Sequence, residues 1–313
     1  MFHNFARIEK RKLTTCCRLG IPLLLQTEKE IDHLLQVGNT SITANNNAIL
    51  DITTCELARK ALDYTLLRLA RAQLSTFPFP HIFVTNVFPE YYYKEILRNL
   101  IDDAPTSGLF KRRGPKKPRY SVDIKRLKIG LTEHSLIGKI HFWNCHQEVF
   151  ASPRMTQALV NPFENIIRRR FRLRNFDFNS FGQTLLLTQD RHEYFITPHC
   201  DVATKFVTNL FYLVDTPEEG NLKSSGTLLL QAIPKGEGAT DLLNFNPNKK
   251  YLKFSRKSYI FKQASFVRNS MVAFAPCTNA WHAVPLQNFR NDTVRNTLQG
   301  FVYYGEQVGL AQC

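Results

Sequence analysis

The chain has 313 residues, of which 43% are hydrophobic, and carries a formal net charge of +15. This length and composition allow one substantial core with an appendage, rather than two equal domains. The longest apolar run near the N-terminus, residues 21–25, is too short for a membrane span or a signal-peptide core. We therefore expect a cytoplasmic protein without membrane contact, and the positive charge favours anionic partners.

The N-terminal residues 1–52 have weak periodicity, which predicts a basic, poorly structured extension with one short helix near residues 28–37. Basic residues dominate positions 1–19, so an organelle presequence is an alternative to a solvated tail. The seven cysteines show no paired spacing of the kind found in zinc sites or disulfide frameworks. A reducing compartment is therefore expected.

An amphipathic helix is predicted over residues 53–76. Thr53 and Glu56 fit a capping box, and apolar residues then recur at helical spacing. The Phe-Pro-Phe-Pro sequence at 77–80 ends this helix, because proline cannot continue its hydrogen-bond ladder. The next predicted elements are a strand at 81–84, a helix from Pro89 and a helix from Asn161.

A basic stretch from about Ala104 to Lys128 is broken by Gly and Pro and is predicted to be a loop. Binding residues often lie on loops over a rigid scaffold, so Arg112, Arg113 and Arg119 are the candidate substrate-binding residues. The alternative is a solvated loop without a partner. Few aromatic residues flank the cluster, so nucleic acid is a weaker candidate than an anionic small molecule or protein.

From residue 182 onward the pattern changes to short β-rich runs separated by turn residues. No alternation of strands with helices is visible, so the chain is predicted to be mainly β with flanking helices, built on a sandwich or barrel-like pair of sheets. The predicted strands are 183–189, 205–214, 227–233, 257–263, 270–275 and 297–304.

Between two of these runs lies the sequence His199-Cys200-Asp201. On an extended strand, residues two apart point to the same face, so His199 and Asp201 can share one ion. His282 would have to arrive from a distant strand, and taken by itself it is more often a hydrogen-bonded core histidine beside Trp281. Two imidazoles and one carboxylate on one face of a metal are typical of non-haem Fe(II) oxygenases.

Arg295 opens a run that otherwise resembles an interior strand, thirteen positions after His282. An inward-pointing arginine needs an anion, and its guanidinium matches a carboxylate bidentately. Thr297, on the same face, could donate a further hydrogen bond. The alternative is a structural salt bridge to an acidic residue of the domain.

These residues resemble a family, the iron(II)/2-oxoglutarate-dependent dioxygenases of the prolyl-hydroxylase-like type, which have a double-stranded β-helix (jelly-roll) core. The family pattern of His-x-Asp/Glu, a distal His and Arg-x-Ser/Thr is matched by His199-Cys200-Asp201, His282 and Arg295-Asn296-Thr297. The resemblance covers about residues 77–305. It implies a dioxygenase domain over 77–313 with its jelly-roll core at about 182–305.

The resemblance also implies a division of labour among these residues. His199, Asp201 and His282 would bind Fe(II), and Arg295, helped by Thr297, would hold the distal carboxylate of 2-oxoglutarate. The cosubstrate and O2 would be converted to succinate and CO2 while a C–H bond of the substrate is hydroxylated.

Tyr194 and Gln183 are further candidates for contact with 2-oxoglutarate. Lys205 follows the ligands on the next strand, and a surface charge is the simplest interpretation of it. Two other functions remain open from the residues alone. One is a non-catalytic jelly-roll module that binds an anionic ligand or nucleic acid. The other is a zinc hydrolase that uses the same ligands and assigns Arg295 to its substrate.

Overall fold

The computed structural model describes ten stretches of the chain, all within one compact unit, Asn47–Cys313. They are residues 47–101, 108–112, 118–127, 134–171, 177–202, 204–214, 224–232, 259–277, 279–287 and 294–304. The extension and short helix predicted before residue 47 lie outside these stretches.

The described helices and strands alternate little along the chain. The helices are α3 (Asn47–Ala70), α4 (Glu90–Arg98), α5 (His134–Phe150), α6 (Pro153–Val160) and α7 (Glu164–Phe171). Three short 3-10 turns lie at Ile124–Arg126, Asn161–Phe163 and Phe178–Ser180. The strands are β1 (His81–Thr85), β2 (Lys111–Arg112), β3 (Arg119–Asp123), β4 (Phe181–Asp190), β5 (Ile196–His199), β6 (Lys205–Leu213), β7 (Thr227–Ala232), β8 (Tyr259–Ala264), β9 (Ser270–Phe274), β10 (Trp281–Val284) and β11 (Arg295–Tyr304).

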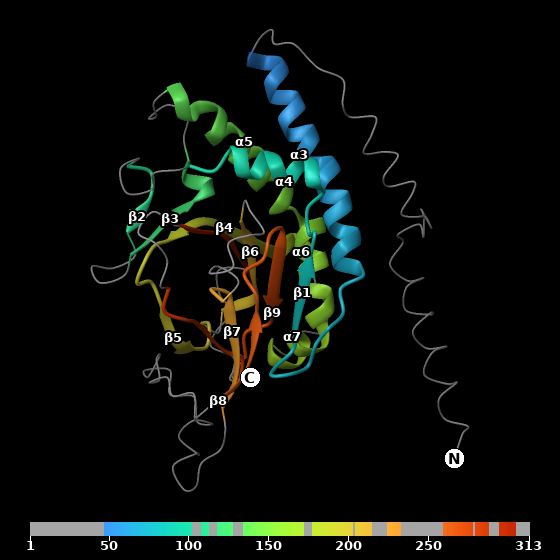
Figure 1. The fold of residues 1–313 in the computed structure, drawn as a ribbon. Coiled ribbons are helices and arrows are strands. Elements are labelled where there is room, and N and C mark those ends of the chain that lie inside the picture. Colours follow the sequence, from blue (N-terminus) through green and yellow to red (C-terminus); the bar gives the residue numbers. More distant parts are fainter. Residues whose placement is uncertain are drawn as a thin grey trace, which may run out of the picture. The chain divides into compact units, whose positions relative to one another are not determined.

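The strands form two antiparallel sheets (Figure 1). The large sheet has the order β1-β9-β6-β11-β4-β3-β2, and the small sheet has the order β5-β10-β7-β8. From β4 onward the chain crosses between them, since β4, β6, β9 and β11 belong to the large sheet and β5, β7, β8 and β10 to the small one. This eight-stranded double sheet is a jelly roll, or double-stranded β-helix, so the predicted fold class is confirmed.

The large sheet has a hydrophobic core on each face. On one face its strands pack against helices, which Figure 1 shows gathered on that side, and the contacts include Ala61, Tyr92 and Trp143 from helices with Leu187, Phe211 and Leu298 from strands. On the other face Tyr212, Val272 and Phe274 meet Leu229 and Ala264 of the small sheet. Because side chains alternate along a strand, each strand of the large sheet sends every second residue between the sheets.

Helix α3 begins at Asn47 and ends at Ala70, rather than spanning 53–76. Residues 47–52 therefore belong to the helix and not to the extension. Thr53 lies inside the helix, so the capping-box interpretation is wrong. Residues 47–52 contain no Gly or Pro, so the helix can begin before Thr53. The C-terminal end comes early because Ser75 pairs with His81 through two backbone hydrogen bonds of 2.9 Å, which draws this segment into an extended connection.

The basic stretch predicted as a loop contains sheet structure. β3 lies beside β4, with Arg119 opposite Asp190 and Ser121 opposite Thr188, and β2 pairs with β3 at its edge. The strand was missed because the charged residues gave the segment a polar appearance, although Ser121 and Val122 are buried there. Part of the stretch, including Arg113, lies outside the described residues.

Cys55 of α3 and Cys145 of α5 form a disulfide, which the spacing of the cysteines did not indicate. The two cysteines are 90 residues apart, and a pairing that depends on tertiary packing leaves no local spacing to recognise. Within the described stretches no helix is long and apolar enough to cross a membrane. The cytoplasmic compartment stays a prediction.

Gly226 is required by the close approach of β7 to β8. A Cβ atom at this position would collide with the backbone carbonyl oxygen of Ala264, which cannot move without disturbing the small sheet. We expect Gly226→Ala to lower the free energy of unfolding by about 1–3 kcal/mol in urea titrations. Gly182→Ala is the matched control, since a Cβ atom there would meet nothing within 4 Å. Equal stability of the two variants would contradict this prediction.

His146 is fully buried against Phe150, with ring centroids 4.4 Å apart, and burial lowers its pKa to about 3. Below pH 6.5, the usual pKa of histidine, His146 is protonated in the unfolded chain but stays neutral in the folded chain. The free energy of unfolding therefore decreases as the pH falls. We expect His146→Phe to reduce the loss of unfolding free energy between about pH 6.5 and about pH 5.0 by about 1.5 kcal/mol. An unchanged pH dependence, measured by urea unfolding, would refute the assignment.

Candidate metal centre

The structure brings the three predicted metal ligands together. His199 ends β5 and stands opposite His282 of β10 in the register of the small sheet, with ring centroids 4.2 Å apart. Asp201 follows two residues after His199, and its Oδ2 lies 3.8 Å from Nε2 of His282. One ligand atom from each of the three residues lies within 4.8 Å of the other two.

Both histidines are oriented by backbone carbonyl groups. Nδ1 of His199 lies 3.0 Å from the carbonyl oxygen of Thr197, and Nδ1 of His282 lies 3.1 Å from that of Ala280. Because a carbonyl oxygen only accepts hydrogen bonds, each Nδ1 carries the proton and each Nε2 keeps the lone pair that a metal needs.

The protonation states also suit a cation. Burial lowers the pKa of His199 to about 3, with a further lowering by the neighbouring His282, and burial likewise lowers the pKa of His282. Both imidazoles are therefore neutral near pH 7. Metal binding requires neutral imidazoles and an ionised carboxylate, so the histidines need not lose protons first.

Asp201 is held at both carboxylate oxygens. Lys205 donates to Oδ1 at 2.7 Å, and Thr208 donates to Oδ2 at 2.6 Å. Burial by itself would raise the pKa of Asp201, but the charge of Lys205, the proximity of His282 and these hydrogen bonds hold it well below its usual range. The Lys205 side chain is only 13% exposed and lies over the Phe301 ring, so its interpretation as a surface charge is wrong.

Two neutral nitrogens and one carboxylate oxygen, converging from one strand pair and the loop after it, fit a divalent transition metal such as Fe(II). The ligand set has no sulfur, and it leaves further coordination positions to other ligands. The site can therefore bind a metal and present an open face to a second molecule.

Arg295 is the first residue of β11, and its side chain is only 1% exposed. Its Nη1 donates to Asp190 at 2.7 Å, and its Nε donates to the carbonyl oxygen of Ser225 at 2.8 Å. The salt bridge to an acidic residue, which the sequence left as an alternative, is thus present. Nη2 has no hydrogen-bond partner within the described stretches.

Asp190 is shared with a second arginine. Arg119 of β3 donates from Nε to Oδ1 at 2.5 Å and from Nη2 to Oδ2 at 2.9 Å. Two guanidinium groups against one carboxylate leave one positive charge in excess in a nearly buried cluster. Burying an uncompensated charge is costly, so this cluster, Arg119-Asp190-Arg295, is suited to bind one further negative group.

The other candidate residues divide between the two faces of the large sheet. Thr297 is buried two residues from Arg295 on the same face, as predicted, and stands opposite Thr188 of β4. The buried ring of Tyr194 lies 4.2 Å from the guanidinium carbon of Arg119, so it joins the cluster through that arginine.

Gln183 does not reach the site. Its Oε1 accepts a hydrogen bond of 3.4 Å from Thr156 of α6, on the face of the sheet that packs against helices. Because side chains alternate, odd-numbered residues of β4 face the helices while Asp190 faces the small sheet. Its candidate role as a contact of 2-oxoglutarate is therefore not supported.

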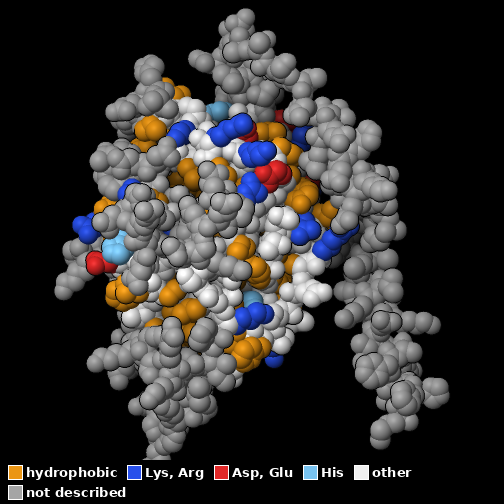
Figure 2. All heavy atoms as spheres, in the orientation of Figure 1, with side chains coloured by type: hydrophobic (Ala, Val, Ile, Leu, Met, Phe, Trp, Pro, Cys, Tyr) orange, Lys and Arg blue, Asp and Glu red, His pale blue; other side chains and the backbone are white. Residues whose placement is uncertain are grey.

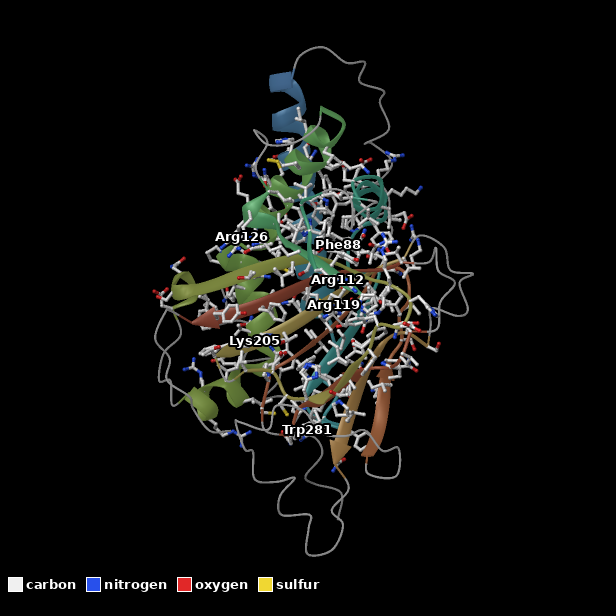
Figure 3. All side chains as sticks on the ribbon, turned by 90° about the vertical axis from the view of Figure 1, so that its left-hand side faces the viewer. Phe88, Arg112, Arg119, Arg126, Lys205 and Trp281 are labelled. Atoms are coloured by element: carbon white, nitrogen blue, oxygen red, sulfur yellow. A yellow bond between two sulfur atoms is a disulfide. The ribbon has the colours of Figure 1, made fainter. Side chains whose placement is uncertain are left out.

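The three arginines proposed for substrate contact are in different situations. Arg112 is exposed on β2, whereas Arg119 is bound in the buried ion pair with Asp190, and Arg113 lies outside the described stretches. Figure 3 shows Arg112 and Arg119 on their neighbouring strands. Arg119 lies on a strand rather than in the predicted loop, and its position opposite Asp190 turns its side chain between the sheets. Its role in substrate contact stays a prediction.

Three residues of the site were missed or misjudged in the sequence: Thr208, Lys205 and Asp190. Lys205 follows Asp201 by four residues and Thr208 follows it by seven, and the turn between β5 and β6 brings both side chains to Asp201. The sequence gives no sign of that turn geometry. Asp190 carried a usable signal, since it is the single charged residue of β4 and the partner strand β11 begins with an arginine opposite it.

No protein-family model and no curated protein matches the sequence. Solved structures are similar in fold. They include an oxidoreductase of the 2OG-Fe(II) oxygenase family from Burkholderia pseudomallei, at 9% identity and a TM-score of 0.41, covering 88% of this chain and 98% of that one. A prolyl-4-hydroxylase from Pseudomonas putida is similar at 12% identity and a TM-score of 0.39, covering 78% and 98%. A dioxygenase for auxin oxidation from rice is similar at 14% identity and a TM-score of 0.42, covering 83% and 84%.

At these identities and TM-scores the likeness is one of fold alone.

The hydrogen bond from Thr208 to Asp201 gives a test of the metal centre. We expect Thr208→Val to weaken the binding of Fe(II), or of Mn2+ as a stable substitute, by about 10–100-fold, because outer partners orient the ligand carboxylate. Anaerobic titration followed by calorimetry measures the effect. Thr184→Val is the control, since Thr184 lies on β4, which β11 separates from Thr208 on β6. Equal affinities of the two variants would argue against a metal at Asp201.

Proposed function

We propose that this chain is an Fe(II)- and 2-oxoglutarate-dependent dioxygenase that hydroxylates a C–H bond of its substrate. The observation that supports this best is the convergence of His199, Asp201 and His282 between the two sheets of a jelly roll. Both imidazoles are neutral and the carboxylate is ionised, so the donor set is ready for a divalent metal.

The buried cationic cluster, which lies at the start of β11, supports the same proposal. 2-Oxoglutarate carries two carboxylates, and the Arg119-Asp190-Arg295 cluster has one positive charge in excess. Thr297 and Gln299 are buried and lie on the same face of β11 as Arg295 and Phe301. The triad lies near Phe301, because Lys205 contacts both the Phe301 ring and Asp201. The distal carboxylate would be held by Arg295 and Thr297, and the keto acid end would reach the metal.

When bound, iron and 2-oxoglutarate supply the oxidising chemistry with O2, releasing succinate and CO2. The chain's own residues do the positioning. Lys205 and Thr208 fix the Asp201 carboxylate, the two backbone carbonyls fix the imidazole rings, and Arg295 fixes the cosubstrate. His282 is buried and His199 and Asp201 are partly buried, which limits the access of water and protects reactive species from side reactions.

The substrate is proposed to be anionic, either a small molecule or an acidic protein. The net charge of +15 supports this, as do the exposed side chains of Lys111 and Arg112 on the edge strand β2. Figure 2 shows Lys and Arg side chains distributed over one face of the molecule, with few acidic ones among them. Nucleic acid is a less favoured partner, because no row of exposed aromatic residues accompanies these charges in the described stretches.

The proposal predicts a visible metal-to-ligand charge-transfer band when the anaerobic protein receives Fe(II) and 2-oxoglutarate. We expect Asp201→Ala to abolish the band, since one metal ligand is lost. Arg295→Met should keep the band but require at least about tenfold more 2-oxoglutarate, because a charge-assisted bond to a carboxylate is worth roughly 1.5–3 kcal/mol.

Arg112→Met is the control for charge alone, because it removes an exposed arginine and should leave the titration unchanged. If the folded parent protein binds Fe(II) without a charge-transfer band at saturating 2-oxoglutarate, the dioxygenase proposal fails. A metal-dependent hydrolase or a binding module would then be the better hypothesis.

A further inference from the structure

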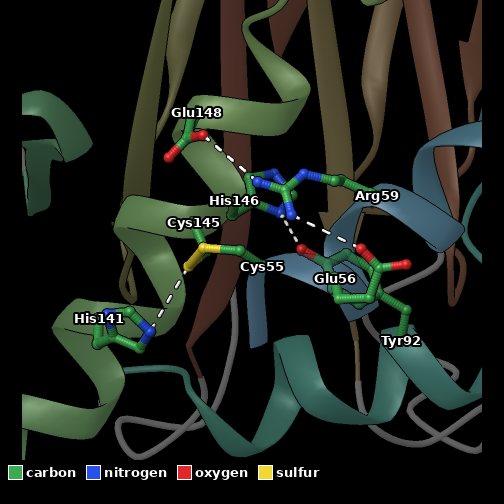
Figure 4. Close-up of a disulfide and its surroundings, with 8 residues drawn as sticks. All are labelled: Cys55, Glu56, Arg59, Tyr92, His141, Cys145, His146 and Glu148. Carbon is green, nitrogen blue, oxygen red and sulfur yellow. Dashed lines mark hydrogen bonds and ion pairs between the residues drawn. A yellow bond between two sulfur atoms is a disulfide. The ribbon is translucent and has the colours of Figure 1, made fainter. Parts of the chain in front are cut away.

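A second group of metal-ligating side chains lies on α3 and α5, away from the triad. Cys55, His141 and Cys145 each offer a ligand atom within 4.8 Å of the other two (Figure 4). Nε2 of His141 lies 3.5 Å from Sγ of Cys145, to which Cys55 is bonded. The group joins two helices that pack against the large sheet.

The disulfide by itself does not account for the histidine. His141 and Cys145 are four residues apart on α5, so their side chains project from the same side of the helix, and Cys55 meets them from α3. Two sulfurs and one imidazole nitrogen are the donor set that Zn2+ prefers in proteins. A pair of i and i+4 ligands on one helix, completed from a second element, is a common way to build such a site.

The charges around the group favour a cation. Arg59 of α3 lies 3.6 Å from Glu56 and 3.8 Å from Glu148, so two carboxylates share one guanidinium and leave one negative charge in excess (Figure 4). These side chains are more than half exposed, so their effect is screened by solvent. The local balance nevertheless contrasts with the chain's overall charge of +15.

We propose that Cys55, His141 and Cys145 form a second metal site, specific for a thiophilic cation such as Zn2+, whenever the two cysteines are reduced. A dithiol reductant would donate two electrons and two protons to the disulfide, giving two thiols and its own disulfide. Each thiol then releases its proton to solvent and binds Zn2+ as a thiolate. Water fills the fourth position, since Cys55 and His141 are only partly buried.

The two chemical states of the group exclude each other. Sulfurs bonded to one another cannot both act as thiolate ligands, so oxidation would expel the metal and reduction would admit it. In a reducing compartment, where disulfides rarely persist, the metal-bound state would be the one that links α3 to α5. This inference does not depend on the proposed dioxygenase activity, because it involves none of the triad residues.

Cobalt(II) is a suitable probe, because thiolate ligands give it an intense near-ultraviolet charge-transfer band that nitrogen and oxygen ligands do not. The full chain, reduced and kept anaerobic, should bind Co2+ with this band, and Zn2+ should displace it. Binding at the His199, Asp201 and His282 triad gives no thiolate band, so the two sites are distinguished in one titration. The oxidised chain should show no band.

His141→Ala is the decisive variant, because it leaves both cysteines able to form the disulfide and so spares the fold. We expect it to weaken Co2+ binding at this site by more than about tenfold, since even outer partners of metal ligands are worth that much. Cys55→Ser should abolish the band, with far-ultraviolet circular dichroism confirming the fold. Cys277→Ser is the control and should change nothing, because Cys277 lies elsewhere and donates to Asn279.

A reduced, folded chain without a thiolate band would overturn the proposal, as would a band that survives in Cys55→Ser. If the band were equally strong in His141→Ala and in the parent protein, His141 would not be a ligand and the proposed three-residue site would be refuted. Loss of the band only in Cys277→Ser would also refute the assignment.

Discussion

The register between β5 and β10 is the constraint on which the metal centre depends. His199 stands opposite His282, so the two imidazoles share the space between the sheets. A shift of either strand by one residue would turn its histidine to the outer face of the small sheet, where Cys200 and Trp281 now lie. The register is held by the pairing of Trp281, His282 and Ala283 with β7, whose close contact with β8 is secured by Gly226.

The large sheet supplies the opposite half of the site. Thr208 and Lys205 of β6 hold Asp201, while Arg295 of β11 and Asp190 of β4 form the cationic end. The metal ligands carry one negative charge and the cluster one positive charge in excess. A molecule with a metal-chelating end and a separate carboxylate therefore meets a complementary group at each end, which neither sheet could provide alone. The jelly roll is needed because it places both sheets face to face.

The fold class could be predicted from the pattern of short β-rich runs, whereas the complete triad was predicted only through the resemblance to the dioxygenase family. Residues two apart on a strand share a face, so His199 and Asp201 were predictable neighbours. The inward orientation of Arg295 was expected from its place at the start of a run that resembles an interior strand. The prediction for Gln183 was not supported, because the sequence does not show which face of β4 packs against the helices and therefore does not show to which side Gln183 points. Pairings set by tertiary packing, such as Cys55 with Cys145 and Arg119 with Asp190, left no local signal.

The double pairing of Asp190 explains why a buried arginine can serve as an anion site and still be stable. An isolated guanidinium between the sheets would pay a large desolvation cost, whereas Asp190 and the Ser225 carbonyl satisfy two of its nitrogens. A full one-to-one pair with Asp190 would leave no net charge for a ligand. Arg119 changes this balance, because by sharing the same carboxylate it returns one positive charge to the cluster. In the proposed function, Arg119 would therefore act on the binding of 2-oxoglutarate through Asp190.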